Sequence, residues 1–153
     1  MKVPKLRFPE FKNNLLKTDL ISKGFFIRGR GIPKDKVSQT GQFCVLYGEL
    51  YTKHNEIIND YKTLSKTNEK NLVYSQYNDL SFPTSTTASP YSLISPSANM
   101  IKDKDIAVGS DTLIYRSKDL MASFLSYYIN GKIKKRKEIA KKAESITIIH
   151  IYE

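Results

Sequence analysis

The chain alternates short runs of β-branched and aromatic residues with clusters of Gly, Pro, Asn and Asp, and this pattern most constrains its fold. Runs of this length and composition, bounded by turn-forming residues, predict strands. Residues 54–58 fit either a strand that continues after a bend or a short helix. The last two internal strands are expected to form a hairpin across Gly109 and Ser110. The predicted strands are residues 20–27, 42–51, 71–74, 79–82, 91–94, 106–108, 112–115 and 146–153.

Helical patterns occupy most of the C-terminal part of the chain. Apolar residues repeat at three- and four-residue steps over residues 119–130, with Ser117 as the predicted N-cap and Gly131 as the predicted stop. A second and strongly basic helix is predicted over residues 132–144. Strands followed by helices in one chain of this length favour a single α+β domain built on a twisted mixed sheet with protruding loops.

We expect that domain to span residues 18–153, because residues 1–17 are interrupted by prolines and read as a basic N-terminal extension. The charge is concentrated at the two ends of the chain. Of the net charge of +10, residues 1–36 contribute +7 and residues 132–144 contribute +5, whereas the long middle section is close to neutral. Basic flanks of this kind suit a polyanionic partner such as DNA, although a solvated helix and a soluble tail explain the same charges.

The residue types that carry catalysis are scarce. Cys44 is the single cysteine and lies in an apolar run, so it is expected to be a small buried residue. His54 and His150 are the only histidines, and no spacing of His, Cys and carboxylates predicts a metal site or a nucleophile with its base. No glycine motif for a bound cofactor is present. We therefore expect no catalytic site, no metal and no cofactor. The single cysteine predicts a reducing, cytoplasmic setting, and the absence of long apolar stretches predicts no membrane partner.

The residues that remain as candidates are those of a DNA-binding surface. Arginine beside glycine can approach a groove or a phosphate closely, small hydroxyls can contact either, and a glutamate can accept a hydrogen bond from cytosine. Three of the candidates, Tyr47, Glu49 and Tyr51, are expected to share one face of a strand. A surface turn at Arg30 and core packing of the tyrosines are the competing interpretations. The candidates are Arg28, Arg30, Lys34, Tyr47, Glu49, Tyr51, Thr52, Ser85, Thr86, Thr87, Lys134, Lys135, Arg136 and Lys137.

Several motifs occur in a recognisable order. They are PKLRFPEF, GRGIPK followed by YGELYT, GSDTLIYR, and FLSYYIN followed by KKRKEIAKKAESITIIHIY. In this order they resemble the target recognition domain of the DNA specificity subunit of bacterial type I restriction-modification systems. The resemblance covers nearly the whole chain and indicates a single recognition domain, either a half-length or a truncated subunit.

The resemblance implies a function without catalysis. Such a subunit reads part of a split site in double-stranded DNA and directs methyltransferase subunits and a motor-nuclease subunit to it. A second half specificity subunit is a further implied partner. The alternative is a structural or regulatory fragment that pairs with a methyltransferase or with another half subunit and does not read DNA.

Overall fold

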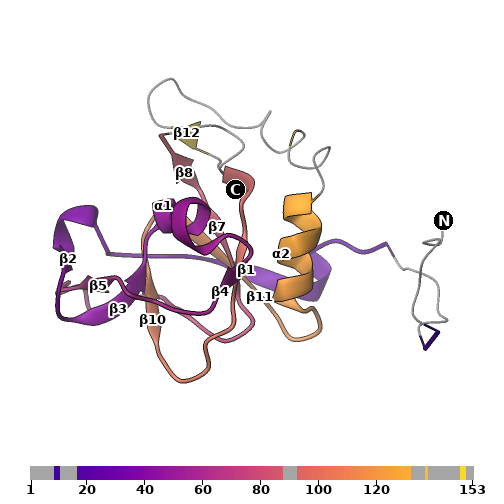
Figure 1. The fold of residues 1–153 in the computed structure, drawn as a ribbon, viewed down its shortest axis with the longest axis horizontal. Helices are drawn as coiled ribbons and strands as arrows, with labels where there is room; N and C mark the ends of the chain where they lie inside the picture. Colours follow the sequence, from indigo (N-terminus) through magenta and orange to yellow (C-terminus); the bar gives the residue numbers. More distant parts are fainter. Residues whose placement is uncertain (1–8, 11–16, 88–92, 132–136, 138–148, 151–153) are drawn as a thin grey trace.

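The structure is a computed structural model, and it describes residues 9–10, 17–87, 93–131, 137 and 149–150. Two five-stranded sheets form the body of the molecule, and a ten-residue helix lies at one end of it (Figure 1). Both sheets are mixed, since each contains one parallel pair among antiparallel ones. The predicted α+β class is therefore confirmed, with two sheets where the sequence suggested one.

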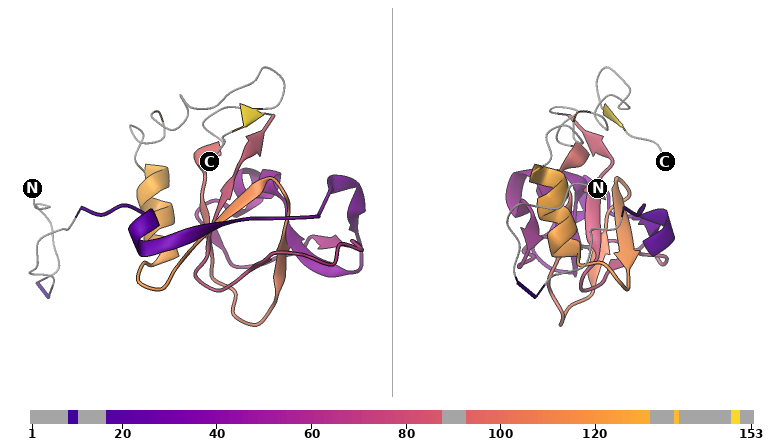
Figure 2. Two further views of the ribbon diagram at one scale, coloured as in Figure 1. Left: turned by 180° about the vertical axis from the view of Figure 1, so that it is seen from behind. Right: turned by 90° about the vertical axis from the view of Figure 1, so that its right-hand side faces the viewer.

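The first sheet holds the longest strands. Its edge strand β1 runs antiparallel to β11 with Phe26 opposite Tyr115, and β11 runs antiparallel to β7 with Leu113 opposite Phe82. In the view from the back of the molecule, β1 lies nearest the viewer, as the outer strand of this sheet (Figure 2, left). In spatial order the strands are β1 (Gly24–Arg28), β11 (Thr112–Ser117), β7 (Leu80–Pro83), β9 (Ser97–Asn99) and β4 (Ile57–Ile58).

The second sheet is made of shorter strands, and a separate two-stranded sheet joins the C-terminal strand to the middle of the chain. In spatial order the second sheet holds β2 (Val37–Ser38), β5 (Leu64–Ser65), β3 (Gln42–Val45), β10 (Ile106–Val108) and β6 (Tyr74–Ser75). In the small sheet, β12 (Ile149–His150) pairs with β8 (Ser85–Thr86).

The main core lies between the two sheets. Side chains from both sheets meet there, among them Val45 and Val108 from the second sheet and Ile58 and Ile114 from the first, all fully buried. A second cluster forms where the first sheet packs against α2 (Ala122–Gly131), and it contains Leu80, Ala98, Tyr115 and Ala122. The first sheet thus has a buried cluster on each face, and burial of this kind allows a chain of this size to fold without a disulfide.

The helix α2 begins three residues later than predicted. The hydroxyl of Ser117 accepts the backbone N–H groups of Asp119 and Leu120 at 3.2 Å each, so it closes a turn before the helix and does not cap it. Asn78, at a positive φ of 67°, accepts the N–H of Ala122 at 2.8 Å. Asparagine tolerates this backbone conformation, and its amide can cap a helix from a distant segment.

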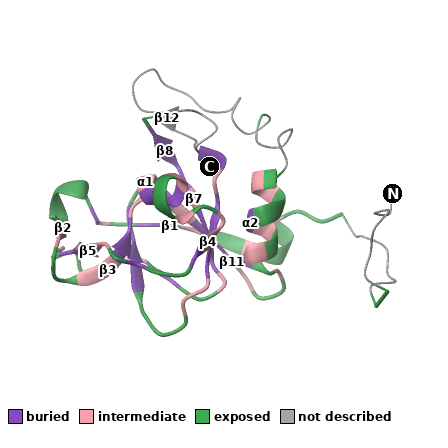
Figure 3. Ribbon diagram, in the orientation of Figure 1, coloured by how far each residue is buried: buried purple, intermediate pink, exposed green. Residues whose placement is uncertain are grey.

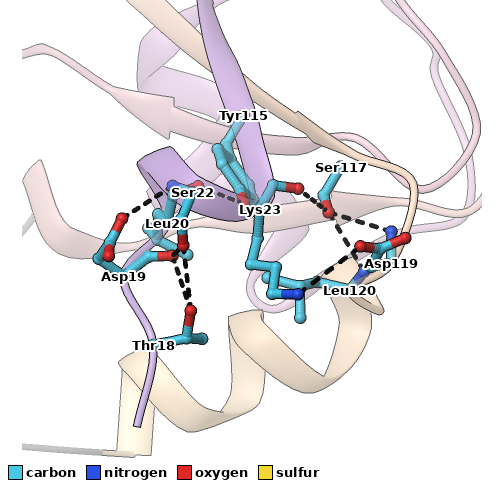
Figure 4. A network of polar contacts seen from close by, with 9 residues as sticks. All are labelled: Thr18, Asp19, Leu20, Ser22, Lys23, Tyr115, Ser117, Asp119 and Leu120. Carbon is cyan, nitrogen blue, oxygen red and sulfur yellow. Dashed lines mark hydrogen bonds and ion pairs between the residues drawn. The ribbon is translucent and has the colours of Figure 1, made fainter.

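The segment before β1 is a short 3-10 helix, η1 (Ile21–Lys23), which shortens the strand predicted over residues 20–27. It is fastened to β11 and to the turn before α2 (Figure 4). Tyr115 donates its hydroxyl to the carbonyl oxygen of Leu20 at 2.8 Å, and Ser117 donates to that of Lys23 at 2.6 Å. These bonds favour a helical turn over an extended backbone at residues 20–23.

Three further strand predictions are corrected. The strand predicted over residues 71–74 is confined to Tyr74–Ser75, whereas that over 79–82 is confirmed with a shift of one residue. Leu93 and Ile94 are buried in a helical turn, and the strand of that region is Ser97–Asn99. The predicted hairpin of β10 and β11 is wrong, because the two strands lie in different sheets.

Two C-terminal predictions fall largely outside the described residues. The basic helix over 132–144 can be followed only at Lys137, and the strand over 146–153 is confirmed for Ile149–His150.

The strand predicted over residues 42–51 ends at Val45, and the chain continues as α1 (Tyr47–Glu49) and the π-helical turn η3 (Leu50–His54). The other short helix is η2 (Lys34–Lys36).

A buried ion pair fixes the middle of the first sheet to the turn before β7. Arg116 donates from Nε and Nη2 to the two carboxylate oxygens of Asp79 at 2.9 and 2.8 Å, and Asp79 also accepts the N–H of Gln76 at 2.7 Å. The side chain of Asp79 is 1% exposed and that of Arg116 is 24% exposed. Removing the cation would leave a buried carboxylate without its counter-charge.

We therefore expect Arg116→Met to lower the free energy of unfolding by about 2–3 kcal/mol, less than for a fully buried pair because Arg116 is partly exposed. Lys118→Met, which removes an exposed charge two residues away, is the control and should change stability by less than about 0.5 kcal/mol. Urea unfolding of both variants measures the difference. Equal stabilities of the two variants would contradict this account.

Candidate nucleic-acid interface

Strands of both sheets end at one place in the molecule. Strand β11 begins at Thr112 beside the ends of β1 and β7, and the N–H of Gly29 donates to the carbonyl oxygen of Thr112 at 2.8 Å. From the second sheet, the N–H of Arg30 donates to Val108 at 2.8 Å, and that of Gly109 donates to Val45 at 3.1 Å. The segments that leave these strands therefore lie together. We call the strand-end surface the set of residues 28–31, 47–52, 84–87 and 110–111.

Gly29 is a point of close backbone approach between the two sheets on this surface. A Cβ there would overlap the carbonyl oxygen of Gly109 and lie 2.7 Å from that of Val108. Gly31 has a φ of +72°, and its N–H donates to the hydroxyl of Ser110 at 3.0 Å. Gly29 thus allows β1 to pack against the second sheet, and Gly31 supplies the positive φ of the turn; the exposed Arg30 lies between the two glycines.

The three basic candidates before residue 40 are all exposed. Arg28 is the last residue of β1, Arg30 follows in the glycine turn, and Lys34 opens η2. The glycine neighbours of Arg28 and Arg30 predicted that these side chains can reach a groove or a phosphate. The structure brings these two arginines onto the strand-end surface, while Lys34 lies further along the chain.

Tyr47, Glu49 and Tyr51 do not share a strand face, because the backbone is helical there. A helix brings residues four apart onto one side, so Tyr47 and Tyr51 lie together with ring centroids 6.5 Å apart while Glu49 points elsewhere. Both tyrosines are half-buried and α1 packs against β7 and β8. Burial raises the pKa of Tyr47, and the neighbouring Tyr51 and Asp111 raise it further. Thr52 is exposed and donates its hydroxyl to the carbonyl oxygen of Gly48 at 2.7 Å.

Glu49 faces the interior and holds this helical turn in place. It is 7% exposed, and its carboxylate accepts the N–H of Leu46 at 3.0 Å, the ammonium of Lys53 at 2.6 Å and the hydroxyl of Thr63. Burial alone would raise its pKa, but the hydrogen bonds from Lys53, Thr63 and Leu46 outweigh burial and lower it. The carboxylate ends β3 by capping the N–H of Leu46, and this is why the predicted strand stops early.

The hydroxyl candidates divide into buried and exposed residues. Ser85 and Thr86 are buried in β8, whereas Thr87 is exposed at its end. Ser85 donates to a carboxylate oxygen of Asp111 at 2.9 Å, and the N–H of Thr84 donates to the backbone oxygen of the same residue at 2.9 Å. Asp111 therefore organises this part of the surface. Asp111 was not among the predicted site residues, although its Gly-Ser-Asp turn between two predicted strands was a visible signal.

Of the basic residues predicted in the C-terminal segment, Lys137 is exposed. Lys134, Lys135 and Arg136 lie outside the described residues. These four positions remain predictions.

Within the described parts of the chain, no group of three or more His, Cys, Asp and Glu residues could hold a metal ion. Cys44 is fully buried, and burial together with the nearby Glu49 raises the pKa of its thiol to about 11. A thiol with this pKa is a poor nucleophile at neutral pH. No helix among the described residues is both long and apolar enough to span a membrane.

Comparison with known proteins gives a clear result for the fold. No family model and no curated protein sequence matches the chain. Among solved structures, the type I restriction-modification S subunit from M. genitalium matches with a TM-score of 0.59 and 17% identity, over 99% of this chain and 34% of that one. The chain shares its fold with S subunits of type I restriction-modification systems. It spans about one-third of their length.

Two other solved structures agree. The HsdS subunit from Thermoanaerobacter tengcongensis matches with a TM-score of 0.56 and 15% identity, over 94% of this chain and 36% of that one. A structure concerned with complex assembly and conformational transition of the type I R-M system matches with a TM-score of 0.56 and 14% identity, over 85% and 32% of the two chains. The fold suggested by the motif order is thereby confirmed.

The close approach at Gly29 gives a test of how this surface is built. We expect Gly29→Ala to destabilise the protein by about 1–3 kcal/mol, because the added Cβ meets backbone atoms that cannot rotate away. Gly131→Ala is the matched control, since nothing lies within 4 Å of its Cβ position and alanine favours helix by about 0.5–1 kcal/mol. Thermal unfolding of both variants compares them. A Gly29→Ala protein as stable as the wild type would exclude the close packing.

Proposed function

We propose that the chain is a non-catalytic DNA-recognition module of a type I restriction-modification system, with the strand-end surface facing double-stranded DNA. The observation that carries this proposal is the convergence of five strand ends, which gathers Arg28, Arg30, Tyr47 and Thr87 from distant parts of the chain. Arginine, tyrosine and threonine side chains are suited to bases and phosphates. The shared fold with S subunits supports the same assignment.

The proposed roles follow from where each side chain lies. Arg30, exposed between two glycines, reads a base edge, and Arg28 together with Lys34 contacts phosphates. Tyr47, Tyr51, Thr52 and Thr87 line the surface and supply hydroxyl groups. Glu49, Ser85 and Thr86 are buried and already hydrogen bonded or packed, so we assign them to supporting the surface from behind.

Catalysis is assigned to partners. In this proposal the DNA-bound module positions methyltransferase subunits and a motor-nuclease subunit, and it carries no metal or cofactor of its own. A second specificity half subunit would supply recognition of the other part of a split site. These partners are proposals, because the chain spans about one-third of the S subunits that share its fold.

A second candidate function is a structural fragment that contacts protein and does not read DNA. The observation that favours it is the exposed aromatic face of α2, which carries no charge. Selection of DNA from a random pool separates the two candidates, since a fragment of this kind would recover no common sequence.

We expect Arg30→Ala to relax the preference at one base pair and to leave the rest of the recovered sequence unchanged. One bidentate contact between arginine and guanine contributes about 1–3 kcal/mol of discrimination. Lys118→Ala removes an equal charge beyond the opposite end of β11 and is the control. Sequencing of the DNA selected by wild type and by both variants is the measurement. If wild type and Arg30→Ala select the same motif, Arg30 does not read a base.

The basic C-terminal segment should contribute through phosphates only. Replacing Lys134 and Lys135 with Gln should weaken binding to all DNA sequences alike and reduce the slope of log Kd against log salt concentration by about two. Lys102→Gln with Lys118→Gln, which lie in exposed loops, is the two-charge control. Fluorescence anisotropy over a salt series measures both slopes. Equal slopes in all three proteins would show that this segment does not touch DNA.

A further inference from the structure

The outer face of α2 is unusual for the surface of a globular domain. Its four outward residues are large and exposed, with relative exposures of 67% for Met121, 63% for Phe124, 59% for Tyr127 and 47% for Tyr128. We call these four residues the α2 aromatic face, of which Met121 directly precedes the helix. Figure 3 shows the exposed side of this helix turned away from the sheets. Helices that face water normally carry charged residues on that side.

No residue of α2 is charged, and this decides which kinds of partner fit the face. The helix reads ASFLSYYING from Ala122 to Gly131. DNA is bound chiefly through Lys and Arg, which release counterions from the phosphates, so a face without cations does not suit it. A membrane surface is bound by helices whose polar face is rich in basic residues, which α2 also lacks. An apolar protein surface remains as the matching partner.

We infer that the α2 aromatic face is a contact between two copies of this chain, related by a two-fold axis that crosses α2 near Phe124. The face is self-complementary, because an uncharged surface meets its own copy without repulsion. Phe124 and Tyr128 already stack within one copy, with centroids 5.9 Å apart and planes inclined by 21°, and so present a broad aromatic surface. This contact does not depend on the proposed role in DNA recognition.

Antiparallel pairing of the two helices also separates like charges. The sequence continues beyond α2 with Lys-Ile-Lys-Lys-Arg-Lys at residues 132–137. With the helices antiparallel, the two Gly131 ends, after which the sequence becomes basic, lie at opposite ends of the contact. A parallel arrangement would place ten positive charges at the same end and is disfavoured at low salt.

The size of the face limits how large the contact can be. Four side chains of this size, about half exposed, offer on the order of 400–500 Å² per copy. Two copies would bury about 1,000 Å², which lies at the low end for specific protein contacts. Interfaces of standard size range from micromolar to picomolar, so for this smaller one we expect a reversible dimer with a dissociation constant on the order of 10⁻⁵ M.

Sedimentation velocity over a protein concentration series tests the contact. We expect the wild type to pass from monomer to dimer over about 1–100 µM, and Phe124→Ser with Tyr128→Ser to weaken dimerisation at least about tenfold. Tyr77→Ser, which alters an exposed aromatic residue elsewhere, is the matched control and should dimerise as the wild type does. A wild type that stays monomeric, or a double variant that dimerises normally, would overturn the inference.

A charge-swap pair removes the ambiguity of a variant that folds poorly. Phe124→Glu and Phe124→Lys should each be monomeric, whereas a mixture of the two should form a heterodimer, because the two positions face each other across the axis. A mixture that associates no better than its components overturns the two-fold arrangement. The DNA affinity of each variant is measured alongside. A loss of DNA binding would mean that the face belongs to the DNA interface, and this result too would overturn the inference.

Discussion

The backbone of Gly29 lies against the backbone of Gly109, and the arrangement of the two sheets depends on this contact. Strand β1 belongs to the first sheet, yet the next two N–H groups after it bond to Thr112 of the same sheet and to Val108 of the other. The chain at residues 109–111 crosses between the sheets at the same place. Because Gly29 has no side chain, the two sheets can approach closely enough for their strand ends to form one surface.

A second constraint acts on the other side of this surface. Glu49 turns its carboxylate inward, caps the N–H of Leu46 and pairs with Lys53, and so converts an extended segment into a helical one. Because of this turn, the rings of Tyr47 and Tyr51 lie next to each other on the strand-end surface. A residue that looked suited to base recognition thus has a supporting position. The low pKa that its hydrogen bonds produce keeps it ionised in that position at neutral pH.

The protein has two surfaces whose side chains differ in chemical character. The strand-end surface combines arginines with hydroxyl groups, whereas the α2 aromatic face is large, apolar and uncharged. These differences follow from the elements that carry them. Loops at strand ends can present side chains with directed hydrogen bonds, while the outer side of a helix presents a broad contact area. A module that binds one partner through each surface is consistent with this division.

The α+β class, the approximate places of β7, β10, β11 and α2, and the fold shared with S subunits could be predicted from the sequence. Those features depend on local periodicity and turn residues, which are readable along the chain. Tertiary structure alone decided that residues 47–54 are helical, that β10 and β11 lie in different sheets, and that Asp111 belongs to the candidate site. Glu49 also bonds locally to Leu46 and Lys53, but each of these features depends in addition on hydrogen bonds or packing between residues further apart in the chain, such as Glu49 with Thr63 and Ser85 with Asp111. Local patterns do not predict which distant residues contact each other, because many chain paths are compatible with the same alternation of apolar and polar residues.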